Sequence, residues 1–297
     1  WQNDGSEIKE ISNKKYPYLK GNLDFVLGGQ KYFFKPGFTW SSLSSGIFSL
    51  RAFDNGFLFD AKGQCFFSDD DEVGYLIYSI LNSKIAPVYF DAISPTLDFN
   101  SGVISKIPIP NLNEKNKQTN KNSVDLKSKS KSDWDSYETS WDFTTLPLLS
   151  SGYRNSNMAE TYAELRSHWQ SMTDEMQRLE EENNKIFIEA YGLQDELTPE
   201  VPIDEITLTC NPHYRYGRNM THEEREARLL SDTMAELLSY AVGCMFGRYS
   251  PDKPGLILAN QGETLEDYLA QVPEPTFEPD EDNVIPMLDG DWFSDDI

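Results

Sequence analysis

The pattern of apolar and polar positions divides the chain into a β-rich first part and a helical second part. Residues 17–70 consist of short aromatic and β-branched runs separated by Gly and Pro, a pattern that predicts antiparallel strands. Residues 75–82 are apolar at helical spacing and predict a helix. Residues 103–109 lie between a turn at Asn100 and a pair of prolines, and predict a short strand. The expected fold class is therefore α+β.

A long helix is predicted in the second part of the chain. From Met158 to Ala190 apolar residues recur in alternating steps of four and three, which is a heptad pattern, and Gly192 marks its end. Asn183 lies on the same seam, where an amide can fix the register of a partner helix. We favour an ordinary helix packed within its own domain over a coiled coil with another chain.

A second helix is predicted after Thr221, because Thr221 and Glu224 have the spacing of a capping box. Its apolar positions continue to Gly247, and we expect it to pack antiparallel to the first helix. A short helix is expected over 264–272. The segment from Pro273 is rich in acidic residues and proline, and we expect it to be extended or disordered.

Residues 111–132 consist mainly of Asn, Lys and Ser, with almost no apolar side chains. This composition predicts a flexible linker or an exposed loop. We therefore expect a first domain over 1–110 and a second, mostly helical domain over 133–297.

The net charge of −23 is distributed unevenly between the two parts. Residues 1–150 contain 16 Lys and Arg against 18 Asp and Glu, whereas residues 151–297 contain 10 against 31. The nearly neutral first part can present a basic face to DNA, because phosphate binding depends on the local potential. The acidic second part should repel DNA and is more typical of a surface that binds a protein partner.

Cysteine usage and hydropathy indicate a cytoplasmic protein. The three cysteines, Cys65, Cys210 and Cys244, are far apart in the sequence and odd in number, which favours reduced thiols over disulfides or a zinc site. No signal peptide and no apolar run long enough to cross a membrane are expected. The three histidines form no metal-binding pattern, and no serine lies in a Gly-x-Ser-x-Gly element, so we expect neither a metal site nor a nucleophilic triad.

Several blocks of the sequence resemble a known protein family. Residues 81–110 resemble the exit from a DNA target-recognition domain, in which a short helix and a polar loop precede a final strand ending in Ile-Pro-Ile-Pro. Such domains occur in type I specificity subunits and in single-chain type II methyltransferases. As a whole, the chain is similar to the C-terminal part of the PglX family, the adenine-specific DNA methyltransferases of BREX phage-exclusion systems. The further blocks that carry this resemblance are 32–43, 56–63, 133–143, the Glu-rich segment after Met158 and the acidic C-terminus.

The resemblance implies a mixed α/β target-recognition domain followed by an acidic helical domain with a long heptad-like helix. It also implies methyl transfer from S-adenosylmethionine to adenine N6, with both the methyl donor and the catalytic motif held by a part of the protein outside this chain. We therefore expect no cofactor and no catalytic residue here. The segment 209–214 contains Asn-Pro-His-Tyr, which differs from the Asn-Pro-Pro-Tyr element of amino-methyltransferases, and we interpret it as a turn.

The expected ligand is double-stranded DNA, bound by Lys and Arg at phosphates or guanine and by Ser, Asn and Gln at base edges. Ser44 and Ser45 lie in a loop that would suit the major groove, and Lys121, Lys127, Lys129 and Lys131 either attract phosphates or keep the linker soluble. The candidate DNA-binding residues are Lys31, Lys35, Trp40, Ser41, Ser42, Arg51, Lys62, Gln64, Lys84, Asn100 and Lys106.

One alternative from a different class stays open. The acidic helical domain can belong to a non-catalytic scaffold that docks other BREX subunits or mimics DNA, since 31 acidic residues in one half exceed what solubility requires. Salt dependence separates the two hypotheses, because phosphate contacts weaken steeply with salt and a scaffold binds no duplex.

Overall fold

The computed structural model describes residues 2–44, 46, 48–60, 62–93, 98–112 and 114–280. The chain forms two compact units: unit 1 is Trp1–Val124 with Glu180–Glu200, and unit 2 is Asp125–Leu179 with Val201–Ile297. Each unit is therefore assembled from two separate stretches of the sequence. The consecutive segments predicted, 1–110, 111–132 and 133–297, do not coincide with these units.

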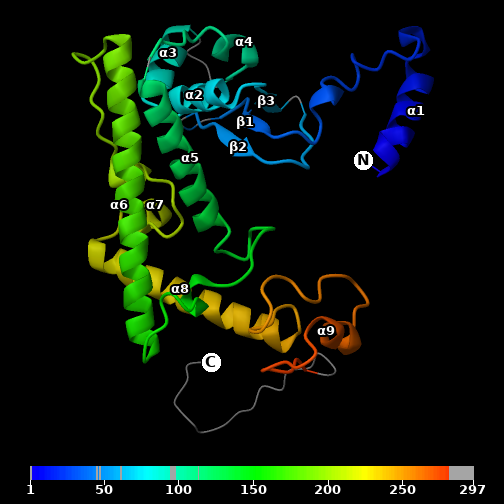
Figure 1. The fold of residues 1–297 in the computed structure, drawn as a ribbon, viewed down its shortest axis with the longest axis vertical. Helices are drawn as coiled ribbons and strands as arrows, with labels where there is room; N and C mark the ends of the chain where they lie inside the picture. The colour runs from blue at the N-terminus through cyan, green and yellow to red at the C-terminus, as the bar shows by residue number, and fades with distance from the viewer. Residues whose placement is uncertain are drawn as a thin grey trace. The chain divides into compact units, whose positions relative to one another are not determined.

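Unit 1 is built on a three-stranded antiparallel sheet with the order β2-β1-β3 (Figure 1). The strands are β1 (Gly37–Ser41), β2 (Arg51–Phe53) and β3 (Gly63–Phe66). All three lie within the stretch predicted to be antiparallel strands, and helices make up most of the remaining regular structure. The α+β class is confirmed.

The helices of unit 1 lie on both sides of the sheet in the sequence. Asp70 caps α2 (Asp71–Leu81) by accepting hydrogen bonds from the backbone N–H groups of residues 72 and 73, so the helix predicted over 75–82 is confirmed. The further helices are α1 (Ser6–Lys15), α3 (Ile85–Ile93) and α4 (Ser101–Ile104).

The strand predicted over 103–109 is wrong. The Asn100 side chain accepts a hydrogen bond from the Val103 backbone N–H at 3.1 Å and caps α4 instead. An N-cap amide satisfies a backbone donor that the first turn leaves open. This local bond outweighs the β-branched composition of the segment that follows.

The prediction of a flexible linker over 111–132 is also wrong, since α5 (Lys115–Trp134) occupies this stretch. In unit 1 its Thr119, Asn122 and Ser123 side chains are buried. The Ser123 hydroxyl contacts the Ser79 hydroxyl, and the Asn122 Nδ2 donates to Asn183 Oδ1 at 3.0 Å. Hydrogen bonds between polar side chains thus hold this part of α5 in place, where apolar contacts usually do so.

The long heptad helix is confirmed as α6 (Met158–Tyr191), and Gly192 follows it with a φ of +70°. Most seam positions are buried within this chain, and Asn183 pairs with α5 of the same chain. The seam therefore packs largely within its own chain.

Unit 2 contains α7 (Pro212–Tyr216), α8 (His222–Met245) and α9 (Leu265–Gln271). The Thr221–Glu224 capping box is present at the start of α8, and the short helix predicted over 264–272 is confirmed as α9. Leu229 of α8 packs with Leu165 and Trp169 of α6 in one apolar cluster. Figure 1 shows α8 crossing α6, so the antiparallel pair predicted for these helices is wrong.

A buried carboxylate connects two parts of unit 2. Asp133 is buried and accepts hydrogen bonds from the backbone N–H groups of Thr209 at 2.6 Å and Cys210 at 3.0 Å. These bonds fix the segment that leads into α7.

Residues 273–280 contain no helix or strand, and the rest of the acidic tail, 281–297, lies outside the described residues. None of the helices within the described ranges is long and apolar enough to cross a membrane.

Candidate nucleic-acid interface

The sheet of unit 1 has one apolar face and one polar face. Phe38 and Trp40 belong to the hydrophobic core together with Leu76 and Ile80 of α2. Side chains alternate along a strand, so Thr39 and Ser41 lie on the opposite face of the sheet.

Strand register brings further residues to this opposite face. Thr39 is paired with Arg51 on β2 and with Cys65 on β3, so these three side chains form one row across the sheet. Arg51 and Ser41 are exposed, and Thr39 Oγ1 donates to the Gln64 carbonyl at 3.0 Å. We call Thr39, Ser41, Arg51 and Cys65 the polar face. Thr39 was missed as a site residue, although its alternation with Trp40 carries the signal that places it there.

Two candidates are core residues. Trp40 is buried and its indole Nε1 donates to the Phe99 carbonyl at 2.6 Å, while the Ser42 side chain is also buried. Ser42 contributes its backbone, which donates to the Lys62 carbonyl and accepts from the Phe99 N–H. Burial leaves neither side chain accessible to a base or a phosphate, so both are withdrawn as DNA contacts.

One corner of the sheet gathers three more candidates. Lys62 is exposed and directly precedes β3. Gln64 Oε1 accepts from the backbone N–H of Ser101 at 2.8 Å, and Asn100 caps α4 next to it. The Gln64 oxygen thus holds α4 against β3 and the Asn100 oxygen caps α4, so the first role of both amides is structural.

An acidic residue lies beside this corner. Asp60 Oδ1 accepts hydrogen bonds from the backbone N–H groups of Lys62 and Gly63, both at 2.8 Å. The Gly63 bond, followed by the Lys62 bond, lowers the pKa of this exposed carboxyl. The carboxylate is therefore charged at neutral pH and offsets part of the positive potential around Lys62.

Two lysines flank an aromatic stack before β1. The Lys31 ammonium lies 4.7 Å and the Lys35 ammonium 5.9 Å from the centroid of the Tyr32 ring. Tyr32 in turn stacks on Phe67 with 4.5 Å between ring centroids. Both lysines are exposed, so the stack presents two positive charges to solvent.

The remaining lysine candidates lie outside the sheet. The Lys84 ammonium donates to the Glu200 carbonyl, and its backbone N–H donates to Asn184 Oδ1 at 3.0 Å. Lys106 is exposed just after α4. The loop residue Ser45 lies outside the described residues.

The Asn-Pro-His-Tyr segment of unit 2, predicted as a turn, is the N-cap and the start of the short helix α7. Asn211 is 1% exposed; its Nδ2 donates to the carbonyls of Ile203 and Ile206, and its Oδ1 accepts from the backbone N–H of His213. Both ends of the amide are thus satisfied internally, which leaves nothing to hold a base.

The chemistry around this turn is that of a protein interior. Burial, followed by the negative charge of Asp133, raises the pKa of the Cys210 thiol, so it is neither a ready nucleophile nor a ready metal ligand. The His213 and His222 rings lie 6.2 Å apart. No group of three or more metal-binding side chains occurs in the part of the chain that the structure describes.

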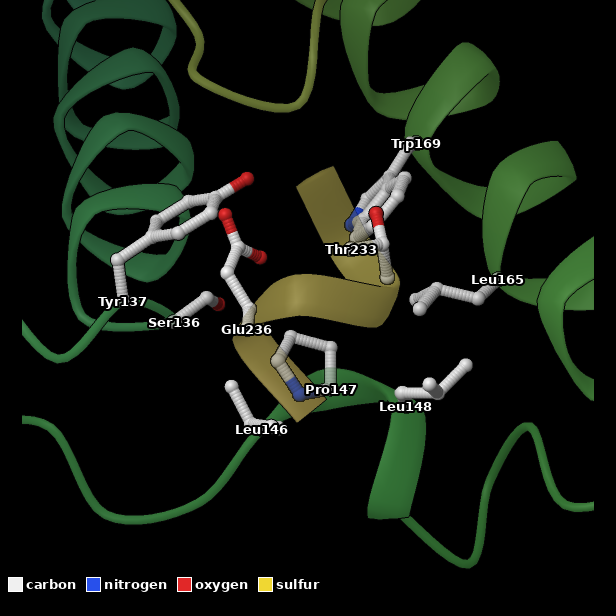
Figure 2. A pocket seen from close by; sticks show the side chains of 9 residues that line it. All are labelled: Ser136, Tyr137, Leu146, Pro147, Leu148, Leu165, Trp169, Thr233 and Glu236. Carbon is white, nitrogen blue, oxygen red and sulfur yellow. The ribbon is translucent and has the colours of Figure 1, made fainter. Parts of the chain in front are cut away.

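A small pocket in unit 2 is also structural. Figure 2 shows the Tyr137 ring and the Glu236 carboxylate pointing toward the same space, beside the apolar side chains of Leu165 and Trp169. Burial raises the pKa of Glu236, although Arg215 donates to its carboxylate at 2.9 Å. The space is large enough for little more than one water molecule, so it is no substrate site.

Comparison with known proteins shows which proteins this chain is similar to. No protein-family model matches the chain. An adenine-specific methyltransferase BrxX from Escherichia coli O9:H4 (strain HS) is 33% identical over 300 residues, which cover 100% of this chain. An adenine-specific methyltransferase PglX from Lacticaseibacillus casei (strain Zhang) is likewise 33% identical over 299 residues, which cover 100% of this chain. The chain is similar to PglX along its whole length.

The resemblance expected from the sequence is confirmed by both relatives. The chain spans 23% of the length of the BrxX protein and 22% of the PglX protein. More than three quarters of each relative therefore has no counterpart here.

Proposed function

We propose that this chain is the DNA target-recognition and C-terminal region of a site-specific adenine-N6 DNA methyltransferase in a BREX phage-exclusion system. The observation that carries the proposal is the match of the entire chain to less than a quarter of two adenine-specific methyltransferases. S-adenosylmethionine would be bound by the larger part of the protein, which would also flip and methylate the adenine. The role of this region would be to choose the site.

Unit 1 supports the proposal through its polar face. A row of hydrogen-bonding side chains on a rigid sheet, with Arg51 exposed at its edge, is suited to contact base edges or phosphates. Lys62 at the corner and Lys31 and Lys35 at the aromatic stack would neutralise phosphates on either side. Lys84 is held by Glu200 and is the weakest of the lysine candidates.

The acidic composition of the second half of the chain favours an additional role as a docking surface for a basic protein partner, such as another BREX subunit. Residues 151–297 contain 31 acidic against 10 basic residues. This charge repels DNA and attracts a basic surface, with an association rate that falls as salt rises.

The test is binding of this chain to duplex DNA, measured by fluorescence anisotropy over a series of salt concentrations. Arg51→Ala and Lys62→Ala should each weaken binding and reduce the slope of log affinity against log salt by about 1. Lys14→Ala, at an exposed residue of α1, is the matched control and should leave the slope unchanged. Absence of duplex binding by the unmodified chain, together with binding to a basic partner, would favour the scaffold instead.

A further inference from the structure

Unit 1 displays an exposed pair of aromatic side chains next to its sheet. Phe34 is 40% exposed and Phe57 is 57% exposed. Their backbone segments are joined by hydrogen bonds from the Phe34 N–H to the Phe57 carbonyl and from the Gly56 N–H to the Phe34 carbonyl, both at 3.0 Å. We call Phe34 and Phe57 the aromatic ridge. Apolar side chains of this size at the surface require an explanation when they are held in fixed positions.

The backbone at the ridge is strained. Phe34 has a φ of +63°, in the left-handed region that a bulky side chain rarely adopts. Glycine occupies this region without penalty, yet the sequence places a phenylalanine here. Strain of this kind persists where the side chain serves a function that a relaxed residue would not provide.

A packed aromatic cluster supports the ridge from behind. Phe33 contacts Phe59 edge to face with 5.3 Å between ring centroids, and both Phe59 and Phe53 contact Phe67. A Cβ at Gly37 would lie 2.9 Å from the Phe67 ring, so the cluster also presses directly on the β1 backbone. The packed cluster therefore holds the segments that carry Phe34 and Phe57 in fixed positions.

Positive charge accompanies the aromatic residues. Lys31 and Lys35 lie over Tyr32, and Tyr32 stacks on Phe67 of the same cluster. Exposed apolar rings flanked by ammonium groups complement a ligand that is anionic outside and offers flat apolar surfaces inside. Duplex DNA has this chemistry, with phosphates at its edge and stacked bases within.

We propose that the aromatic ridge inserts between adjacent base pairs of duplex DNA beside the recognised site, while Lys31 and Lys35 contact the neighbouring phosphates. The inference rests on the proposed function and adds the residues that deform the duplex. Apolar wedges kink DNA by partly unstacking a base step, and the extra protein–DNA contact offsets the unstacking cost. Loosening the stack next to an adenine also lowers the cost of extruding it.

A wedge predicts a preference for DNA that is already unstacked. An abasic position removes a base from the stack, so insertion there does not require the unstacking that a paired duplex demands. The unmodified chain should therefore bind a duplex with one abasic position about tenfold more tightly than the same duplex fully paired, a ratio that corresponds to about 1.4 kcal/mol.

The experiment measures both affinities by anisotropy for the unmodified chain and three variants. Phe57→Ala and Phe34→Gly should each reduce the preference for the abasic duplex to less than about twofold, because the contacts that remain do not depend on an unstacked base. Phe34→Gly fits the backbone at this position, so its loss of preference would not reflect misfolding. Phe25→Ala is the control, because Phe25 is 86% exposed in the same unit and lies outside the ridge.

The outcomes separate the wedge from the function on which it rests. Binding of the paired duplex without any preference for the abasic one, or a preference that survives in both ridge variants, would overturn the wedge and leave the recognition function intact. Failure of the unmodified chain to bind either duplex would overturn both.

Discussion

Replacing Asn183 by Leu removes the carbonyl oxygen that accepts from Asn122 and leaves a buried amide N–H without an acceptor. The two side chains are 5% and 1% exposed, so water cannot easily take the place of the lost partner. The Asn122 Oδ1 keeps its hydrogen bond from Gln118 at 2.8 Å, and Ser123 keeps its contact with Ser79. The change therefore leaves one buried donor unsatisfied and removes the long hydrogen bond, 3.5 Å, from the Asn183 Nδ2 to the Ser123 hydroxyl.

The magnitude follows from the cost of an unsatisfied buried polar group. We expect Asn183→Leu, and likewise Asn122→Leu, to lower the free energy of unfolding by about 1–3 kcal/mol. Replacing both residues by Leu removes the orphaned donor as well as its acceptor, and Leu is close to Asn in size. The double variant should then approach the stability of the unmodified protein, so the coupling energy between the two positions approaches the sum of the two single losses, about 2–6 kcal/mol.

The assay is urea unfolding, followed by circular dichroism, of the unmodified protein, the two single variants and the double variant. The slope of the unfolding free energy against urea concentration should be the same in all four, which shows that the same transition is compared. A double variant whose loss equals the sum of the two single losses would refute the argument. Additivity would mean that the amides contribute independently and that their mutual hydrogen bond does not hold α5 against α6 in unit 1.

Three further changes test the account. Asp133→Ala leaves two backbone donors unsatisfied and should cost about 2–4 kcal/mol in urea unfolding, and unchanged stability would contradict the role given to this carboxylate. Arg166 donates to Glu226 at 2.7 and 2.8 Å and holds the pKa of that carboxyl below its usual 4.5, so this contribution to stability is present above about pH 4.5 and is lost as pH falls through the folded-state pKa. Arg166→Met should therefore flatten the fall in melting temperature between pH 6 and pH 3, and an equally steep fall would argue against the pair. Phe34→Gly should be more stable than Phe34→Ala by about 1 kcal/mol, the reverse of the usual order, because only Ala keeps a Cβ in the left-handed region.

Helix ends were predictable because they depend on residues close in the sequence. The Thr221 cap and the stop at Gly192 each satisfy or release backbone groups within one turn. Heptad spacing likewise located α6, since a seam of this length has few alternatives.

Helix α5 was not predictable from hydropathy. Its buried positions include Thr119, Asn122 and Ser123, which are polar and therefore appeared to be solvent-exposed. Their partners Ser79 and Asn183 are about 40 and 60 residues away in the sequence, so the pattern of one segment contains no sign of them. A polar helix of this kind becomes stable only when the tertiary fold supplies its hydrogen-bonding partners.

The candidate interface was predictable in composition but not in geometry. Aromatic and serine residues near β1 were expected at the surface, yet the alternation of the strand turns Trp40 into the core and leaves Thr39 on the polar face. Pairing of Thr39 with Arg51 depends on strand register, which the loop between β1 and β2 sets.

The central claim is that this region selects the adenine to be methylated. Its most direct test uses the full-length protein with Arg51 and Lys62 changed together to Ala, beside a Lys14→Ala control, and maps adenine methylation across the genome by single-molecule sequencing. The account predicts that methylation is lost or moved to other sites in the double variant, while the melting temperature of that variant is unchanged. The Lys14→Ala control should methylate the same sites as the unmodified protein. Methylation at unchanged sites and unchanged levels in the double variant would contradict it.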